Sequence, residues 1–238
     1  MPPLTHYTGS LEAVSGILTY GFAWYPNSRR LSELLLPTIP LRKREPQQFG
    51  MVSFTELSPV EAGAHKERFG PFGIAVSEAW AARHRAQRVF YVPTSGPLTE
   101  ALQRLFEAGA QDLANRLPVS AESRFHMSYE NRALASTIAG AGLWRNLLTI
   151  WEYLEPEDSA AQREWRIVNP EPDYTDFGTK PEAIQAVSPP ENWAKFNRVL
   201  PISSEEVVHL VCPHSRLEAL RASLPPAFTA LPVLETDG

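Results

Sequence analysis

The chain has 238 residues, of which 43% are hydrophobic and 21% are charged. This composition is typical of a globular protein and excludes a wholly disordered chain. The formal net charge of −5 disfavours a dedicated nucleic-acid coat protein, whose domain is strongly basic. A single cysteine, Cys212, excludes an internal disulfide framework and a multi-cysteine zinc site.

Proline accounts for 22 residues, about twice the usual share. Because proline interrupts helices and strands, we expect a loop-rich α+β protein rather than a helical bundle. The uncharged apolar runs are far shorter than the ~20 residues that a membrane span needs. The first residues lack both the basic and the apolar part of a secretory signal. We therefore expect a cytoplasmic protein that makes no membrane contact.

The first elements along the chain have clear boundaries. Residues 4–8 predict a short strand. Ser10 is a natural N-cap for the helix that follows, which has an apolar stripe at helical spacing, and Gly21 ends that helix. Residues 22–50 are rich in proline and arginine without a regular period, and they predict a long irregular loop.

The rest of the chain predicts short strands on both sides of a helical block. Residues 98–154 follow a helical pattern and form a helical insertion in a single domain spanning 1–238. Because strands and helices do not alternate along the chain, we predict the α+β class. The further elements expected are strands at 51–55, 72–76, 88–92, 165–168, 198–202 and 207–211, and helices at 59–69, 77–85 and 214–224.

Several standard signatures are missing from the sequence. There is no G-x-x-x-x-G-K-[ST] phosphate loop, no H-E-x-x-H metal helix and no G-x-S-x-G nucleophile elbow. The G-x-G at residues 140–142 has no strand before it. His209, Cys212 and His214 lie close in sequence but are weak evidence for a metal site, so we expect no metal.

Three short segments carry polar residues on predicted strands. They are His6-Tyr7-Thr8, Ser53-Phe54-Thr55-Glu56 and Glu164-Trp165-Arg166-Ile167-Val168. Because side chains alternate along a strand, Glu164 and Arg166 share one face, and Trp165 and Ile167 share the other. A carboxylate and a guanidinium on one face suit a polar cleft. Simpler interpretations stay open, namely helix capping, strand pairing and a solvated ion pair.

The opening HYTGSLEAVSGILTYGF resembles the first motif of ADP-ribosyltransferase-fold proteins such as DarT. Residues 52–92, REWRIV at 163–168 and LPISSEEVVHLVCP at 200–213 resemble the AbiGi family of abortive phage-infection proteins. These stretches cover about half of the chain. The resemblance implies a split antiparallel β-sheet with flanking helices that binds NAD as a substrate.

The resemblance also implies roles for individual residues. Glu164 would be the catalytic glutamate, and Gln162 would precede it in a Q-x-E pattern. A carboxylate suits that place because it stabilises the positive charge that develops on the ribose when nicotinamide leaves. An aromatic side chain, Trp24 or Tyr25, could stack on nicotinamide. The residues implied to bind NAD are His6, Thr8, Tyr25, Ser53 and Thr55.

Two functions follow as expectations. The first is an NAD-dependent ADP-ribosyltransferase (a transferase) of phage defence that modifies a protein or a nucleic acid. A nucleic-acid acceptor would meet the basic residues between positions 29 and 44. The alternative is a non-catalytic, antitoxin-like or regulatory module on the same fold, which would bind a protein partner of a defence or toxin–antitoxin system. The basic residues concerned are Arg29, Arg30, Arg42, Lys43 and Arg44.

Overall fold

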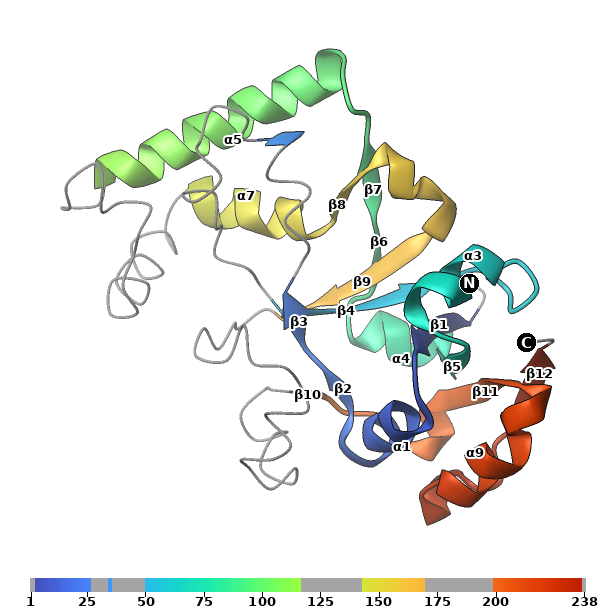
Figure 1. Ribbon diagram of the computed structural model, residues 1–238. Coiled ribbons are helices and arrows are strands. Elements are labelled where there is room, and N and C mark those ends of the chain that lie inside the picture. The colour runs from blue at the N-terminus through green and yellow to red at the C-terminus, as the bar shows by residue number, and fades with distance from the viewer. Residues whose placement is uncertain (1–2, 27–33, 36–49, 117–142, 170–198, 237–238) are drawn as a thin grey trace. The chain divides into compact units, whose positions relative to one another are not determined.

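The computed structural model of the chain describes residues 3–26, 34–35, 50–116, 143–169 and 199–236 (Figure 1). Contacts between residues divide the chain into two compact units. The first unit comprises Met1–Tyr25, Gly50–Arg88 and Ala161–Gly238, and the second comprises Pro26–Phe49 and Val89–Ala160. The helical insertion expected at 98–154 lies within the second unit.

The first unit is built on a large sheet in which strands from distant parts of the chain are neighbours. The strand order is β12-β11-β5-β1-β4-β9-β6, and β3 (Tyr25–Pro26) also pairs with β4. Helices flank this sheet (Figure 1), so the predicted α+β class is confirmed. The other strands are β1 (Leu4–Thr8), β4 (Gly50–Thr55), β5 (Phe72–Val76), β6 (Gln87–Arg88), β9 (Glu164–Val168), β11 (Val207–Pro213) and β12 (Val233–Thr236).

The sheet is mixed, which differs from the antiparallel sheet that we expected. Neighbouring strands run antiparallel from β11 through to β6. β12 runs parallel to β11, with Val233 opposite Leu210. This parallel pair is possible because 3-10 turns and helix α9 (Leu217–Ser223) carry the chain back before β12 begins.

Strand β1 lies between β5 and β4 and pairs with β5 over more residues than with β4. It pairs with β5 along its whole length, from Leu4 opposite Val76 to Thr8 opposite Phe72. Its pairing with β4 is limited to Thr5 opposite Thr55. The ladder between β1 and β4 is therefore short, and a side chain from β1 reaches β4 beyond the paired residues, as described below.

Helix α1 (Leu11–Tyr20) forms where the sequence predicts it. The hydroxyl of Ser10 accepts a hydrogen bond from the backbone N–H of Ala13, which satisfies one of the free donors of the first turn. Gly21 ends the helix with a φ of 105°, a conformation that favours glycine. Val14 and Leu18 are buried on the face that meets the core.

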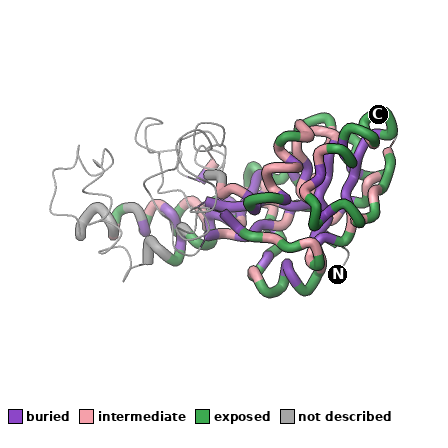
Figure 2. Tube along the Cα trace, turned by 90° about the horizontal axis from the view of Figure 1, so that it is seen from below, coloured by how far each residue is buried: buried purple, intermediate pink, exposed green. Residues whose placement is uncertain are grey.

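The remaining helices of the first unit are short. α3 (Gly63–Phe69) begins four residues later than the sequence predicts and ends at Gly70, whose φ is 112°. α4 (Glu78–Arg83) is capped by Ser77, as expected. α9 packs against α1. Figure 2 shows buried segments running through the middle of the sheet and exposed segments along the helices.

One face of the sheet forms a continuous apolar core. Val52 and Phe54 of β4 lie on this face together with Ile167 of β9 and the indole of Trp80. Burial of each such side chain contributes roughly 1.5–3 kcal/mol of favourable transfer free energy. Further buried members of this core are Leu4, Val14, Leu18, Phe22, Phe72, Ile74, Val76, Leu200, Leu210 and Leu220.

The described part of the second unit includes helices α5 (Pro97–Arg116) and α7 (Leu143–Glu152) and strands β7 (Phe90–Val92) and β8 (Leu154–Pro156). α5 packs against α7, and the ring of Phe106 meets that of Trp151 edge to face at 4.9 Å. β7 pairs in parallel with β8. The single strand expected at 88–92 is therefore wrong, because β6 and β7 belong to different sheets.

The chain returns to the first unit through a 3-10 segment, Glu157–Gln162. β10 (Val199–Leu200) is shorter than the strand expected at 198–202, and it pairs with β2 (Phe22–Ala23) in a separate two-stranded sheet. The helix expected at 214–224 is a 3-10 turn followed by α9. Among the described helices, none has the length and apolar character that crossing a bilayer requires.

Candidate functional site

The centre of the candidate site is a hydrogen bond between two neighbouring strands. β4 and β9 are antiparallel, with Ser53 opposite Arg166 and Thr55 opposite Glu164. Directly paired residues share a face, so all four side chains lie on one side of the sheet. The hydroxyl of Ser53 donates a hydrogen bond of 2.6 Å to Oε1 of Glu164. The predicted proximity of Ser53 and Glu164 is therefore present in the structure.

Arg166 holds the carboxylate of Glu164 from the same strand. Its Nε donates to Oε1 at 2.8 Å and its Nη2 donates to Oε2 at 3.1 Å. The two side chains are 2% and 9% exposed, respectively. Both oxygens of Glu164 thus accept charge-assisted hydrogen bonds in a dry environment, where such bonds are strong and geometrically specific. The carboxylate is fixed in place before any ligand arrives.

On the other face of β9, the indole of Trp165 bonds to Glu56, the residue that follows β4. Trp165 packs against the apolar core, and its Nε1 donates to Oε2 of Glu56 at 2.9 Å. The same carboxylate forms an ion pair with Arg88 of β6. Trp165 and Ile167 lie on the face opposite Glu164 and Arg166, so the predicted alternation along β9 is confirmed. The polar face that carries Glu164 and Arg166 is also buried, whereas a polar cleft was expected there.

Thr55 has a structural position rather than one open to a ligand. Its side chain is fully buried; the hydroxyl donates to the carbonyl oxygen of Gln162 at 2.6 Å and accepts from the N–H of Leu57 at 3.2 Å. Arg163, between Gln162 and Glu164, has a φ of 44°, which is uncommon for a residue with a side chain. The Thr55 bond ties this turn to β4 immediately before Glu164.

His6 lies on the opposite face from Glu164. Its ring meets Phe22 at 5.2 Å and Phe54 at 5.8 Å, both edge to face. Its Nδ1 donates to the backbone carbonyl of Ser53 at 2.8 Å, beyond the paired part of β1 and β4. Burial lowers the pKa of His6, and the hydrogen bond with Ser53 opposes that shift. The side chains of His6 and Glu164 therefore do not meet in this structure, which differs from the single cleft expected for them.

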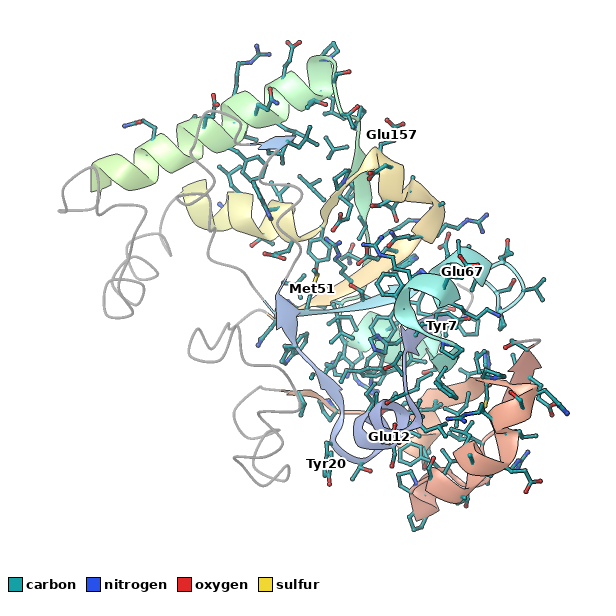
Figure 3. The ribbon with its side chains drawn as sticks, viewed as in Figure 1. Tyr7, Glu12, Tyr20, Met51, Glu67 and Glu157 are labelled. Atoms are coloured by element: carbon teal, nitrogen blue, oxygen red, sulfur yellow. The ribbon has the colours of Figure 1, made fainter. Side chains whose placement is uncertain are left out.

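Tyr7 and His65 join the site without having been predicted. Tyr7 is on the same face as Glu164, because β1 alternates and Thr5 is opposite Thr55. His65 is on α3, which packs on β1 (Figure 3 labels Tyr7 and, on α3, Glu67). The two rings meet edge to face at 5.4 Å. The alternation of β1 is the sequence signal that points to Tyr7; His65 has no such signal, because its helix is too short to show a period.

The other predicted residues are either away from Glu164 or outside the described part of the structure. Thr8 is the last residue of β1, half-buried and opposite Phe72. Tyr25 lies in β3, but its side chain is outside the described part of the structure. Trp24 is partly buried against the apolar core. The basic residues proposed for a nucleic-acid acceptor lie outside the described residues, namely Arg29, Arg30, Arg42, Lys43 and Arg44.

Comparisons with known proteins leave the family open. No protein-family model, curated protein or solved structure matches this chain. Within the described ranges, no three His, Cys, Asp or Glu side chains are arranged to hold a metal ion. The chemistry of the site is consequently argued from its own residues: a fixed carboxylate, a hydroxyl and a guanidinium on one face, with an imidazole and a phenol nearby.

Proposed function

We propose that this chain is an NAD-dependent ADP-ribosyltransferase of phage defence (abortive infection) that acts in the cytoplasm. The observation that carries the proposal is the bond between the Ser53 hydroxyl and the Glu164 carboxylate. It joins the second and third motifs, on β4 and β9, and β1 with the first motif is the next strand in the sheet. Three motifs distant in sequence thus occupy three adjacent strands, and the second and third meet on one face, whereas His6 of the first motif lies on the other face.

The residues of the site suit cleavage of the bond between nicotinamide and ribose. Positive charge develops on the ribose as nicotinamide leaves, and a carboxylate already held in place stabilises that charge without reorganising. In this proposal Glu164 is that carboxylate. Ser53 and Arg166 fix its orientation through the three hydrogen bonds described above. His6 acts indirectly, by holding β4 at the carbonyl of Ser53.

A non-catalytic binding module is the second candidate, and one observation favours it. Both oxygens of Glu164 accept hydrogen bonds within the protein, and the residue as a whole is only 7% exposed. A buried ion pair of this kind can serve folding alone. In that case the chain binds a protein partner of a defence system and leaves NAD intact.

The deciding experiment follows NAD by proton NMR in the presence of the purified full-length chain. Wild type is compared with Glu164→Gln and with a matched control, Glu67→Gln. Glu67 is an exposed carboxylate on α3, and the structure gives it no place at the site. The glutamine at 164 keeps an oxygen that can accept from Arg166 but removes the negative charge of a buried ion pair. Circular dichroism must therefore show that Glu164→Gln is folded before its activity is compared with that of wild type.

Free nicotinamide released by wild type and by Glu67→Gln, with release slowed about 100-fold or more in Glu164→Gln, would support the transferase. Unchanged release in Glu164→Gln would show that Glu164 is not catalytic. Wild-type protein that neither broadens the NAD signals nor releases nicotinamide, and that forms a stable complex with a protein encoded next to it, would support the binding module instead.

A further inference from the structure

Two polar atoms of neighbouring side chains are buried without a hydrogen-bond partner on the Glu164 side of the sheet, where the register of β11 with β5 also places a third such atom, Nε2 of His209. The two neighbouring atoms are the hydroxyl of Tyr7 and Nδ1 of His65. Tyr7 is only 5% exposed. A buried polar group left unpaired costs roughly 1–3 kcal/mol, so native structures rarely keep one without a reason. Here two such atoms belong to side chains whose rings touch.

The surroundings of this pair combine apolar side chains with two charged groups near His65, the carboxylate of Glu164 and the guanidinium of Arg68. Tyr7 clusters with Leu57, Ala62 and Val211, all buried. On the other side of His65, the ring of Phe69 lies 4.5 Å away and is 39% exposed. Hydrophobic surface thus lies next to both rings, and charged groups are near His65 alone. A pattern of few polar groups on apolar walls is typical of small-molecule sites.

Both side chains are uncharged at neutral pH. Burial raises the pKa of Tyr7 to about 12. Burial lowers the pKa of His65 to about 4, although the nearby charge of Glu164 acts in the opposite direction. The phenol is therefore a hydrogen-bond donor, and the imidazole tautomer with its proton on Nε2 offers Nδ1 as an acceptor. Neither side chain of the pair supplies a counter-charge to a charged ligand group, although Arg68 lies near enough to act on His65.

We propose that Tyr7 and His65 form a subsite for an uncharged amide, which presents a carbonyl acceptor beside an N–H donor. The Tyr7 hydroxyl donates to the carbonyl oxygen of the ligand, and Nδ1 of His65 accepts from its N–H. Two sources have this chemistry: the carboxamide of nicotinamide and the amide edge of a nucleobase. The subsite goes beyond the proposed function, which supplies only the first of these two probes.

The subsite explains why both atoms are unpaired at the same place. The rings of Tyr7 and His65 are inclined by 64°. In this arrangement the Tyr7 hydroxyl and Nδ1 of His65 do not hydrogen-bond to each other, and each can bond to a ligand. A purely structural pair would gain by bonding to each other or to the backbone.

The test titrates the full chain with four small probes and reads the imidazole of His65 by two-dimensional ¹H–¹⁵N NMR. Nicotinamide and uridine carry the amide, and nicotinate is the charged counterpart of nicotinamide. Acetate controls for any weak anion binding. Millimolar affinity is expected, because so few atoms are contacted. His65→Gln lacks the imidazole and therefore assigns its signal. Tyr7→Phe is compared with Tyr20→Phe, a partly exposed tyrosine, and with His209→Gln, whose Nε2 is also buried without a partner.

The expected result is that nicotinamide or uridine shifts the His65 Nδ1 resonance in wild type and in both controls, whereas nicotinate and acetate do not. Binding weakens about tenfold in Tyr7→Phe, as for the loss of one hydrogen bond. The melting temperature of Tyr7→Phe without ligand stays at or above that of wild type, because no bond within the protein is lost. Which amide binds identifies the source.

Three results would overturn the subsite: no binding of either amide, equal binding of nicotinate, or affinity in Tyr7→Phe within about twofold of wild type. A lower melting temperature in Tyr7→Phe would assign the hydroxyl a structural bond instead. The outcome is separable from the transferase proposal. If amide binding depends on Tyr7 but the protein never cleaves NAD, the subsite is supported and the transferase is refuted. If the protein cleaves NAD but binds neither amide through Tyr7, the transferase is supported and the subsite is refuted.

Discussion

Replacing Arg166 with methionine tests whether the buried ion pair holds β4 and β9 together. Methionine fills much of the same space but leaves the Glu164 carboxylate with Ser53 as its bonding partner among the contacts described here. Removing one member of a pair that is 2% and 9% exposed costs about 3–5 kcal/mol, because the charge of Glu164 stays buried without the guanidinium. The matched variant replaces both members, Arg166→Met with Glu164→Leu, and costs far less.

Hydrogen exchange is the suitable assay because the chain has two units and one melting curve would mix them. Exchange is read by mass spectrometry on peptides covering β4 and β9. The single variant Arg166→Met accelerates exchange there by about two to four orders of magnitude, and the double variant restores most of the protection. Acceleration below about tenfold in the single variant would refute the idea that this pair secures the two strands.

Three further predictions concern the helices and turns around the site. Ser10→Ala removes the cap of α1 and lowers the free energy of unfolding by about 1 kcal/mol; denaturation of Ser10→Thr, which keeps the cap, should match wild type. Gly70→Ala disrupts the C-terminal end of α3, because a Cβ at a φ of 112° would overlap the Gly9 backbone. Loss of soluble protein, or a decrease of more than about 2 kcal/mol in the free energy of unfolding, is expected, and a neutral effect would contradict the geometry. Burial lowers the pKa of His65 from 6.5 to about 4, so the unfolded chain takes up the proton first as the pH falls. The contribution of His65 to stability is therefore full above pH 6.5 and is lost as the pH drops through about 4. His65→Gln should flatten this part of the stability curve, and an NMR titration midpoint near 6.5 would show that the ring is solvated.

Features set by neighbouring residues could be predicted from the sequence. Helix α1 needs only Ser10 to begin it, an apolar stripe to hold it and Gly21 to end it, and all three signals lie within twelve positions. The common face of Glu164 and Arg166 also follows from local alternation along one strand. These predictions are confirmed because no distant residue competes with the local preference.

Features set by distant partners could not be predicted. Residues 88–92 look like one strand, yet Arg88 pairs with Trp165 and Phe90 pairs with Leu154 in another sheet. β12 is held by a parallel partner, β11, which no local pattern reveals. His6 was expected on the Glu164 side of the sheet, but Tyr7 lies there. The register between β1 and β4 decides this, because a shift of one residue moves every side chain of a strand to the other face.

The parallel pairing of β7 with β8 has a consequence for how the candidate site assembles. Ser53 and Glu164 are 111 positions apart, so their contact requires the closure of a very long loop. Loop closure costs entropy that grows with the logarithm of loop length, about 0.6 kcal/mol for each doubling. Phe90 and Leu154 are paired, so the segment between them enters and leaves the second unit on adjacent strands.

If the second unit forms first, it shortens the effective connection between the strands that carry the site, and β9 finds β4 sooner. An inserted segment whose ends lie side by side also has the geometry in which one insert can be exchanged for another without disturbing its host. The sequence between β7 and β8 can therefore diverge freely while the carboxylate of Glu164 stays in register with Ser53.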